Sequence, residues 1–210
     1  MGFPDEGSLR NATSMLVTQK KLAEKSFFDI AFPDRQRYFA TYEMAEMLTR
    51  MGERLHLQFN KNLAISDISK VKGGLLSPHL SHQIGMDADI AYPSATNNTK
   101  FPVVVDMRSR RFNPNLFSVA KTFDLLKFAF SQEDLKIDRI FIDRSIKASL
   151  CEYAKAKGEL TGSDKSLVQR LFKSIEHVNG HGDHFHLRLS CTPAHPGCRK
   201  KNYIEVAGCQ

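Results

Sequence analysis

The stretch that decides the fold is His181-Gly182-Asp183-His184-Phe185-His186-Leu187-Arg188-Leu189. From His184 onward its polar and apolar residues alternate. A β-strand sends every second side chain to the same face, so His184, His186 and Arg188 should share one face above an apolar layer. The stretch therefore predicts a strand that carries two neighbouring imidazoles.

An earlier stretch supplies the groups that can meet these imidazoles. It reads His79-Leu80-Ser81-His82-Gln83-Ile84-Gly85-Met86-Asp87-Ala88-Asp89 and continues as Ile90-Ala91-Tyr92. Asp87 and Asp89 alternate with apolar residues, which predicts a second strand with both carboxylates on one face. We expect the two strands to pair in one sheet. Asp89 would then reach the histidine face, and His82 would reach the same point from the turn before its strand.

Two imidazoles and a carboxylate that converge form a common ligand set for catalytic zinc. Such sites usually take three protein ligands and leave the fourth position for water. A single histidine on a polar sheet face is more often structural. Here five of the eight histidines lie in these two stretches, beside three acidic residues. The pattern therefore predicts a metal site.

The composition is that of an ordinary globular protein. The chain has 210 residues, of which 41% are hydrophobic and 25% charged, and a chain of this length can bury a sizeable core without help. We predict one domain over residues 1–210, with an irregular N-terminal arm at residues 1–34. No apolar run reaches the length needed to cross a bilayer.

The net charge of +7 raises the question of a nucleic-acid partner. No basic run with interleaved aromatic residues is present, and the densest basic patch is only Arg108-Ser109-Arg110-Arg111. A solvated face, or attraction to an anionic polymer such as a cell wall, explains the charge equally well. We therefore expect no nucleic-acid partner.

Hydrophobic periodicity and turn residues predict the remaining elements. Helices are expected at residues 41–57, 115–130, 145–157 and 163–175, and further strands at residues 63–69, 101–107 and 137–142. This mixture predicts an α+β fold. We expect a central antiparallel sheet with helices on one face and a zinc-binding groove on the other.

The four cysteines all lie in the last third of the chain. They are Cys151, Cys191, Cys198 and Cys209. None forms a C-x-x-C pair, so two disulfides that tie down a tail at residues 190–210 are favoured over a second metal site. Disulfides imply an oxidising compartment. Because no apolar segment typical of an export signal follows Met1, we expect that such a signal was removed.

Both histidine stretches resemble a known family. Ser81-His82-Gln83 with Gly85 and Asp87-Ala88-Asp89-Ile90 is similar to the first metal motif of the penicillin-insensitive murein endopeptidases, and His181-x-x-His184-x-His186 is similar to their closing motif. This family is related to lysostaphin, the D-Ala-D-Ala peptidases and the Hedgehog amino domain. Weaker likenesses run through most of the chain, including Ser66-Asp67-Ile68-Ser69 and Arg139-Ile140-Phe141-Ile142.

The resemblance implies a zinc peptidase of the bacterial envelope, periplasmic or secreted, with one Zn²⁺ per chain. Its substrates would be the cross-linked peptides of peptidoglycan, chiefly at the D-alanyl–meso-diaminopimelate amide. The family's zinc ligands match His82, Asp89 and His186. Histidines that the family needs for activity match His184 and His181.

The resemblance also implies features outside the ligand set. A further family histidine near the metal matches His79. Family disulfides match Cys151 with Cys209 and Cys191 with Cys198. A disulfide that the family has near its N-terminus has no counterpart, because no cysteine precedes residue 151.

The residues around the predicted site leave several roles open. His184 lies two positions from His186 on the same strand face, which makes it the favoured general base, or the donor that stabilises an oxyanion. Asp183 is the rival base, although strand alternation from His184 would turn it away unless the chain bends. Asp87 can orient a ligand imidazole or be a solvated carboxylate. Arg188 can bind a substrate carboxylate or form a surface salt bridge.

Two other functional classes compete with the peptidase. One is a non-catalytic zinc-containing module that binds the cell wall or a protein, which predicts a missing ligand or a blocked water position. The other is a basic nucleic-acid-binding protein with a structural zinc, which predicts a closed, cysteine-rich site. The sequence retains all the expected ligands and lacks that cysteine spacing, so the peptidase is favoured.

Overall fold

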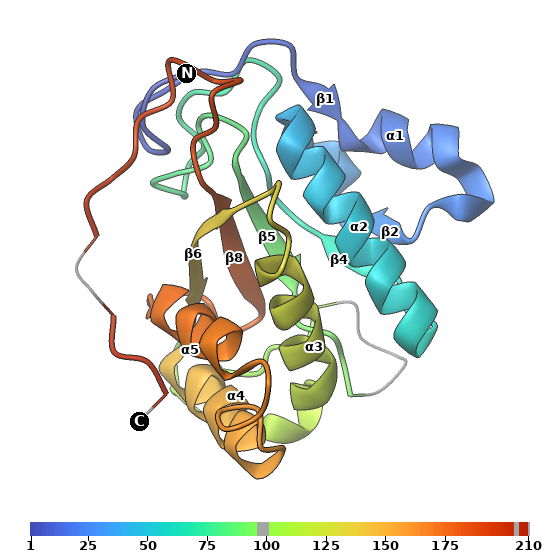
Figure 1. The fold of residues 1–210 in the computed structure, drawn as a ribbon. Coiled ribbons are helices and arrows are strands. Elements are labelled where there is room, and N and C mark those ends of the chain that lie inside the picture. Colours follow the sequence, from blue (N-terminus) through green and yellow to red (C-terminus); the bar gives the residue numbers. More distant parts are fainter. Residues whose placement is uncertain (96–100, 204–205, 210) are drawn as a thin grey trace. The chain divides into compact units, whose positions relative to one another are not determined.

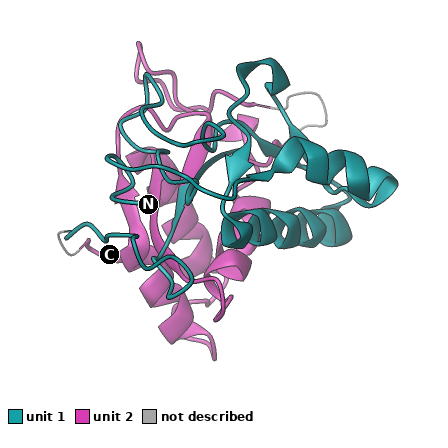
Figure 2. Ribbon diagram, turned by 90° about the horizontal axis from the view of Figure 1, so that it is seen from above, with its two compact units in different colours: residues 1–90, 187–203 teal, residues 91–186, 204–210 magenta. Residues whose placement is uncertain are grey.

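The structure is a computed structural model that describes residues 1–95, 101–203 and 206–209. Within these residues it has a β-sheet and five α-helices, which confirms the α+β class. The chain forms two compact units, coloured separately in Figure 2. Unit 1 comprises residues 1–90 and 187–203, and unit 2 comprises residues 91–186 and 206–209. The prediction of a single domain over residues 1–210 stays a prediction.

Unit 1 is built around helix α2, Tyr42–Phe59. The helix begins after Thr41, whose hydroxyl accepts a hydrogen bond from the Met44 N–H at 3.2 Å, as expected of an N-cap residue. The helix lies against strands β2 (Phe28–Ile30) and β4 (Leu63–Ile65), as Figure 1 shows. The helix expected at residues 41–57 is confirmed.

The strands of unit 1 bring the earlier histidine stretch into the sheet. β2 runs parallel to β4, and β4 runs antiparallel to β5 (Asp87–Ala91). Strand β8 (His184–Leu189) contributes its last residues to this unit, where the Leu189 N–H donates to the Met86 carbonyl at 3.0 Å. The strands predicted from the two histidine stretches are both confirmed.

Residues 1–34 do not form the irregular arm that we expected. They contain β1 (Thr13–Ser14), helix α1 (Met15–Leu22) and β2, and β1 pairs with β3 (Phe39–Ala40). Met15 is the one buried residue of α1, so the helix lacks the apolar stripe from which helices are predicted. It depends instead on a local cap, because the Ser14 hydroxyl accepts a hydrogen bond from the Val17 N–H at 3.3 Å.

Unit 2 combines helices with β-strands. Its helices are α3 (Val119–Phe130), α4 (Arg144–Ala156) and α5 (Lys165–Ser174), and its strands are β6 (Ile137–Ile142), β7 (Ile175–His177) and the first residues of β8. β6 and β7 are parallel. Because this pair and the β2–β4 pair of unit 1 are both parallel, the strands are not all antiparallel as we expected.

Several boundaries differ from the sequence-based expectations. The helix expected from residue 115 begins at Val119, because Ser118 provides its N-cap, and Pro114–Leu116 forms a separate 3₁₀ turn. The strand expected at 63–69 ends at Ile65. Two further 3₁₀ turns span Ala23–Lys25 and Pro33–Arg35. The helices predicted at residues 145–157 and 163–175 are confirmed within two residues, except that Ile175 begins β7.

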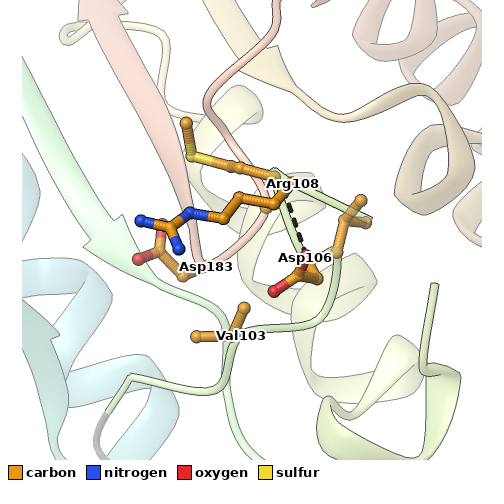
Figure 3. Close-up of a pocket in the computed structure, with 7 residues that line it drawn as sticks. Val103, Asp106, Arg108 and Asp183 are labelled. Atoms are coloured by element: carbon orange, nitrogen blue, oxygen red, sulfur yellow. Dashed lines mark hydrogen bonds between the residues drawn. The ribbon is translucent and has the colours of Figure 1, made fainter. Parts of the chain in front are cut away.

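The strand expected at residues 101–107 is a loop, shown from close by in Figure 3. Val104 and Val105 are buried, but Val103 is 52% exposed. The N–H groups of Val104 and Val105 both donate to the Gly182 carbonyl, at 2.8 and 3.0 Å. An apolar run alone does not distinguish a buried strand from a buried loop. Here the two hydrogen bonds to the Gly182 carbonyl take the place of the regular hydrogen bonds between paired strands.

The two disulfides join Cys151 to Cys209 in unit 2 and Cys191 to Cys198 in unit 1. Both pairings are those that the family resemblance implies. Among the helices of the described residues, none is both long enough and apolar enough to cross a membrane.

Candidate functional site

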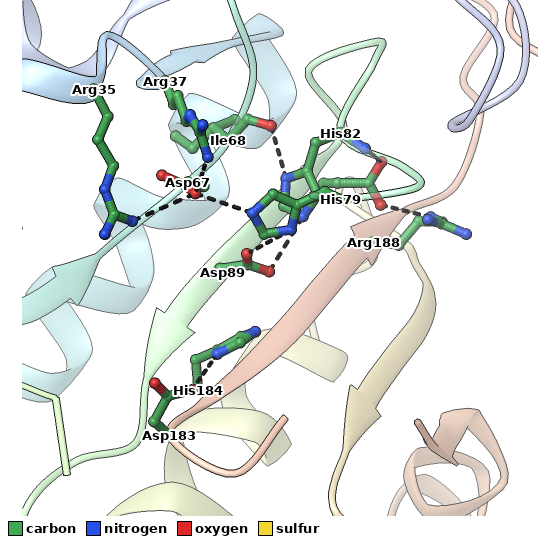
Figure 4. A network of polar contacts seen from close by, with 11 residues as sticks. Arg35, Arg37, Asp67, Ile68, His79, His82, Asp89, Asp183, His184 and Arg188 are labelled. Atoms are coloured by element: carbon green, nitrogen blue, oxygen red, sulfur yellow. Dashed lines mark hydrogen bonds and ion pairs between the residues drawn. The ribbon is translucent and has the colours of Figure 1, made fainter. Parts of the chain in front are cut away.

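Three side chains of unit 1 form a group that could hold a metal ion. Ligand atoms of His79, His82 and Asp89 all lie within 4.8 Å of one another. His82 Nε2 is 3.2 Å from Asp89 Oδ1, and His79 Nδ1 is 3.5 Å from Asp89 Oδ2 (Figure 4). The turn before β5 thus brings His82 to Asp89, as the sequence predicts.

The protonation of His82 is fixed by its other ring nitrogen. Nδ1 lies 2.8 Å from the Ile68 carbonyl oxygen, which can only accept a hydrogen bond, so Nδ1 carries the proton. In the neutral imidazole Nε2 then bears a lone pair, and it faces an Asp89 oxygen that is also an acceptor. Two acceptors at 3.2 Å repel one another unless a cation or a proton lies beside them.

His79 repeats this arrangement on the other oxygen of the same carboxylate. Its Nε2 is 3.0 Å from Asp67 Oδ2, so Nε2 donates and Nδ1 of the neutral ring faces Asp89. Both imidazoles thus direct an unprotonated nitrogen toward Asp89, and each is held by an acceptor behind it. Metal-binding histidines have this kind of support, which fixes the tautomer and the ring orientation. The residues present fit a divalent cation.

The backbone of His82 is held in an uncommon conformation. Its φ of 66° lies in the left-handed region, where a non-glycine residue costs about 1–3 kcal/mol unless its surroundings fix it. Asp87 Oδ2 accepts a hydrogen bond from the His82 N–H at 3.3 Å, and the side chain of His82 is fully buried. Strain of this kind is common where a side chain must be aimed at a ligand.

Asp87 orients His82 through this backbone bond. Its other oxygen accepts from Arg188 Nε at 2.6 Å, and Arg188 also contacts the Tyr203 hydroxyl. Arg188 is 5% exposed, so this is a buried ion pair and not the surface pair considered from the sequence. Burial alone would lower the pKa of Arg188, but the Asp87 carboxylate and the Tyr203 hydroxyl outweigh it and raise the pKa.

Asp67 is the site residue that sequence reasoning missed. It follows β4, is 3% exposed, and accepts hydrogen bonds from His79 and from Arg37, the latter at 3.0 Å. Burial alone would raise the pKa of its carboxyl, but these two hydrogen bonds outweigh it and lower the pKa. The only signal in the sequence was its place in Ser66-Asp67-Ile68-Ser69, which the family resemblance included.

The remaining predicted residues form a histidine cluster in unit 2. The His181 ring lies 5.0 Å from the His184 ring and 5.9 Å from the His186 ring, measured between centroids. His181 Nδ1 is 3.0 Å from the Val178 carbonyl oxygen, and the Phe141 ring meets His186 edge-on at 5.1 Å. His186 is 5% exposed. These contacts fix the rings of His181 and His186.

Strand alternation suggested that Asp183 would be turned away from His184, but the structure brings the two side chains together. Asp183 Oδ1 is 2.6 Å from His184 Nδ1 (Figure 4). β8 begins at His184, so Asp183 lies before the strand and the alternation rule does not apply to it. The pair keeps the proton on Nδ1 and leaves Nε2 of the neutral His184 ring as an acceptor.

The other three histidines have structural contacts. His56 stacks on Phe27 at 4.2 Å between ring centroids, and His195 Nε2 is 2.7 Å from Glu43 Oε2. His177 Nδ1 is 3.4 Å from the Ile142 carbonyl oxygen.

The fold and the site define a class of protein. It has an α+β fold and a His79–His82–Asp89 group suited to a divalent metal, in which hydrogen bonds set the tautomers of the two histidines. Comparison with known proteins makes the class specific. A family model described as penicillin-insensitive murein endopeptidase matches residues 1–210, and the chain belongs to this family.

Curated relatives agree with this family assignment. The chain is 30% identical over 191 residues to a penicillin-insensitive murein endopeptidase of Haemophilus influenzae. The aligned region covers 81% of this chain and 62% of that protein. It is 27% identical to proteins of the same name from Klebsiella pneumoniae and Yersinia enterocolitica, over 78% and 80% of this chain. The chain spans about three-fifths of the length of these relatives.

Asp67 gives a testable prediction. Replacing Asp67 by Ala removes the acceptor that fixes the His79 tautomer, so we expect metal affinity to fall about tenfold to a hundredfold. The affinity is measured by chelator competition on protein whose fold is checked by circular dichroism. Arg35→Ala is the matched control, because Arg35 is largely exposed and lies 3.6 Å from the same carboxylate. Equal affinities in the folded Asp67 variant and the wild type would show that Asp67 does not support the site.

Proposed function

We propose that this chain is a zinc-dependent peptidoglycan endopeptidase that hydrolyses cross-link amides, chiefly the D-alanyl–meso-diaminopimelate bond. The observation that carries the proposal is a pair of imidazole nitrogens, one of His79 and one of His82, that face the two oxygens of the buried Asp89 carboxylate. Membership of the murein endopeptidase family supports peptidoglycan as the substrate. The proposed location is the periplasm or the cell exterior, where both disulfides would be stable.

The proposed zinc ligands are His82, Asp89 and His186, with one ion per chain. His82 and Asp89 have the geometry described above, and His186 is assigned from the His181-x-x-His184-x-His186 motif. Imidazole nitrogens and a carboxylate oxygen suit zinc, and two histidines with one carboxylate is a known catalytic set. His79 then belongs to the support of the site, holding the second Asp89 oxygen.

A bound zinc would lower the pKa of a water molecule to about 7 and polarise the scissile carbonyl. The protein's own contribution is proton transfer by His184. Its Nε2 takes the proton of the attacking water and later gives it to the leaving amine, as a general base and then a general acid. Asp183 holds Nδ1–H and stabilises the imidazolium that forms, as a carboxylate does in hydrolytic triads.

This assignment also gives roles to the neighbouring residues. The 2.6 Å contact between Asp183 and His184 favours His184 as the base and Asp183 as the residue that positions it. His181 packs beside the His184 ring and is proposed as the second catalytic histidine. No observation favours the alternative of a non-catalytic wall-binding or protein-binding module.

The ligand set is tested by zinc content. We expect His82→Ala and His186→Ala to lose the bound zinc, because each removes a ligand, while His79→Ala should keep one zinc with weaker affinity. Zinc is measured by mass spectrometry of the intact, natively folded protein. If His186→Ala kept zinc and His79→Ala lost it, the ligands would be His79, His82 and Asp89 instead.

Activity is tested by digestion of purified peptidoglycan, followed by mass analysis of the fragments. We expect cross-linked muropeptide dimers to be converted to monomers, with loss of activity in chelator and recovery on adding zinc. His184→Ala should lower the turnover rate about 10²–10⁴-fold without loss of zinc. His195→Ala is the matched control, because it removes an imidazole that is paired with Glu43 and has no proposed part in the site. Wild-type turnover by His184→Ala, or cleavage unaffected by chelator, would contradict the mechanism.

A further inference from the structure

A second feature of unit 2 lies beside the Asp183–His184 pair. It is a cavity of about 350 Å³, lined by Val103, Val105, Asp106, Met107, Arg108, Gly182 and Asp183 (Figure 3). We call it the Arg108 pocket. Neither the metal group nor the proton transfer of His184 uses its lining residues, apart from Asp183. The cavity is large enough to take a single amino-acid side chain.

The loop that forms the Arg108 pocket is held in place by its own hydrogen bonds. Asp106 Oδ1 accepts from the N–H groups of Arg108 and Ser109, at 3.1 and 2.6 Å, and from the Ser109 hydroxyl at 2.8 Å. The Asp106 N–H donates to the Arg111 carbonyl at 3.0 Å, and the chain pairs again between Val105 and Phe112. These bonds present Met107 and Arg108 at the tip of a closed turn.

The base of this loop is anchored next to Asp183. The Gly182 carbonyl accepts both N–H groups of Val104 and Val105, and a Cβ atom at Gly182 would collide with the Val105 carbonyl. Glycine is therefore required for the approach of the two segments. Backbone hydrogen bonds to Gly182 therefore hold the loop of the Arg108 pocket next to the Asp183–His184 pair within unit 2.

The charges around the Arg108 pocket are mixed. The guanidinium of Arg108 has no hydrogen bond or ion pair with any residue that the structure describes, and its side chain is exposed. Asp106 and Asp183 each use one oxygen internally, on the turn and on His184. The lining thus has one positive and two negative charges. A simple anion would meet a net negative site, whereas a group with both an ammonium and a carboxylate would find a partner for each.

The walls of the Arg108 pocket are aliphatic. Val103 is 52% exposed and Met107 62% exposed, which is uncommon for large apolar side chains, and both lie on the pocket lining. A short methylene chain in the cavity would remove part of this apolar surface from water. The lining therefore matches an aliphatic chain that ends in a zwitterion.

We propose that the Arg108 pocket is a specificity site for the side chain of the diaminopimelate on the donor stem peptide, an inference that rests on the proposed function. In a cross-linked dimer this side chain keeps its free amine, because the scissile amide uses the amine of the other diaminopimelate. The methylenes of the donor side chain would pack on Val103, Val105 and Met107, while Arg108 binds the carboxylate and Asp183 accepts from the ammonium. This side chain ends in an α-amino carboxylate, the combination of charges that the lining complements. Lysine has the ammonium alone and would leave Arg108 without a partner.

The inference is tested by binding of small peptides to zinc-free protein, measured by calorimetry. The probes are L-Ala-γ-D-Glu-meso-diaminopimelate, the same tripeptide with the side-chain carboxylate amidated, and the tripeptide with lysine in place of diaminopimelate. We expect the wild type to bind the first about tenfold more tightly than the other two, as one charge-assisted hydrogen-bonded pair provides. Equal binding of all three by the wild type would overturn the proposal.

Two arginine variants separate a specific contact from general charge attraction. Arg108→Gln should bind all three tripeptides with the same, weaker affinity. Arg111→Gln makes the same change of charge on the same loop, outside the pocket lining, and should retain the tenfold preference. Loss of the preference in Arg111→Gln, or its survival in Arg108→Gln, would contradict the assignment.

Cleavage assays distinguish this inference from the proposed function. If the wild type cuts cross-linked dimers, Arg108→Gln should raise KM about tenfold with little change in kcat. Cleavage with an unchanged KM in Arg108→Gln would refute the pocket and leave the peptidase standing. A tenfold tripeptide preference in a protein that cuts nothing would support the pocket and refute the peptidase.

Discussion

The candidate metal site depends on a simple constraint: a carbonyl oxygen can only accept a hydrogen bond. The Ile68 carbonyl therefore fixes the proton of His82 on Nδ1, and the Asp67 carboxylate does the same for Nε2 of His79. In the neutral rings, both imidazoles then direct a lone pair at the oxygens of Asp89. A buried arrangement of acceptors facing acceptors is unfavourable by itself. A divalent cation turns the same arrangement into a set of ligands.

The same principle organises the histidines of unit 2. Asp183 and the Val178 carbonyl hold Nδ1 of His184 and of His181, so both rings direct Nε2 elsewhere. In each unit, the ring nitrogen that points away from the site is held by a loop carboxylate or a backbone carbonyl. Support of this kind sets orientation and protonation together, which a catalytic residue needs as much as its own chemistry.

The sequence predicted those parts of the molecule that follow from local periodicity. The stripe of α2, the strand β6 and the alternation of β8 all follow from side-chain spacing, as does the approach of His82 to Asp89 from a turn. Helix α1 was missed because only Met15 of it is buried. The apolar run at Val103–Val105 predicts a strand but forms a loop, because burial of an apolar run does not specify the partners of its backbone N–H groups. Asp67 was missed because its role depends on a contact with His79 twelve residues away.

The most direct test is to observe the ring nitrogens of His82 by long-range ¹⁵N NMR, before and after zinc is added. We expect Nδ1 to remain protonated throughout, held by the Ile68 carbonyl, and the Nε2 resonance to move to the position of a metal-bound nitrogen at one equivalent of zinc. A His82 ring whose Nε2 resonance is unchanged by zinc, or whose proton lies on Nε2 in the zinc-treated protein, would contradict the account.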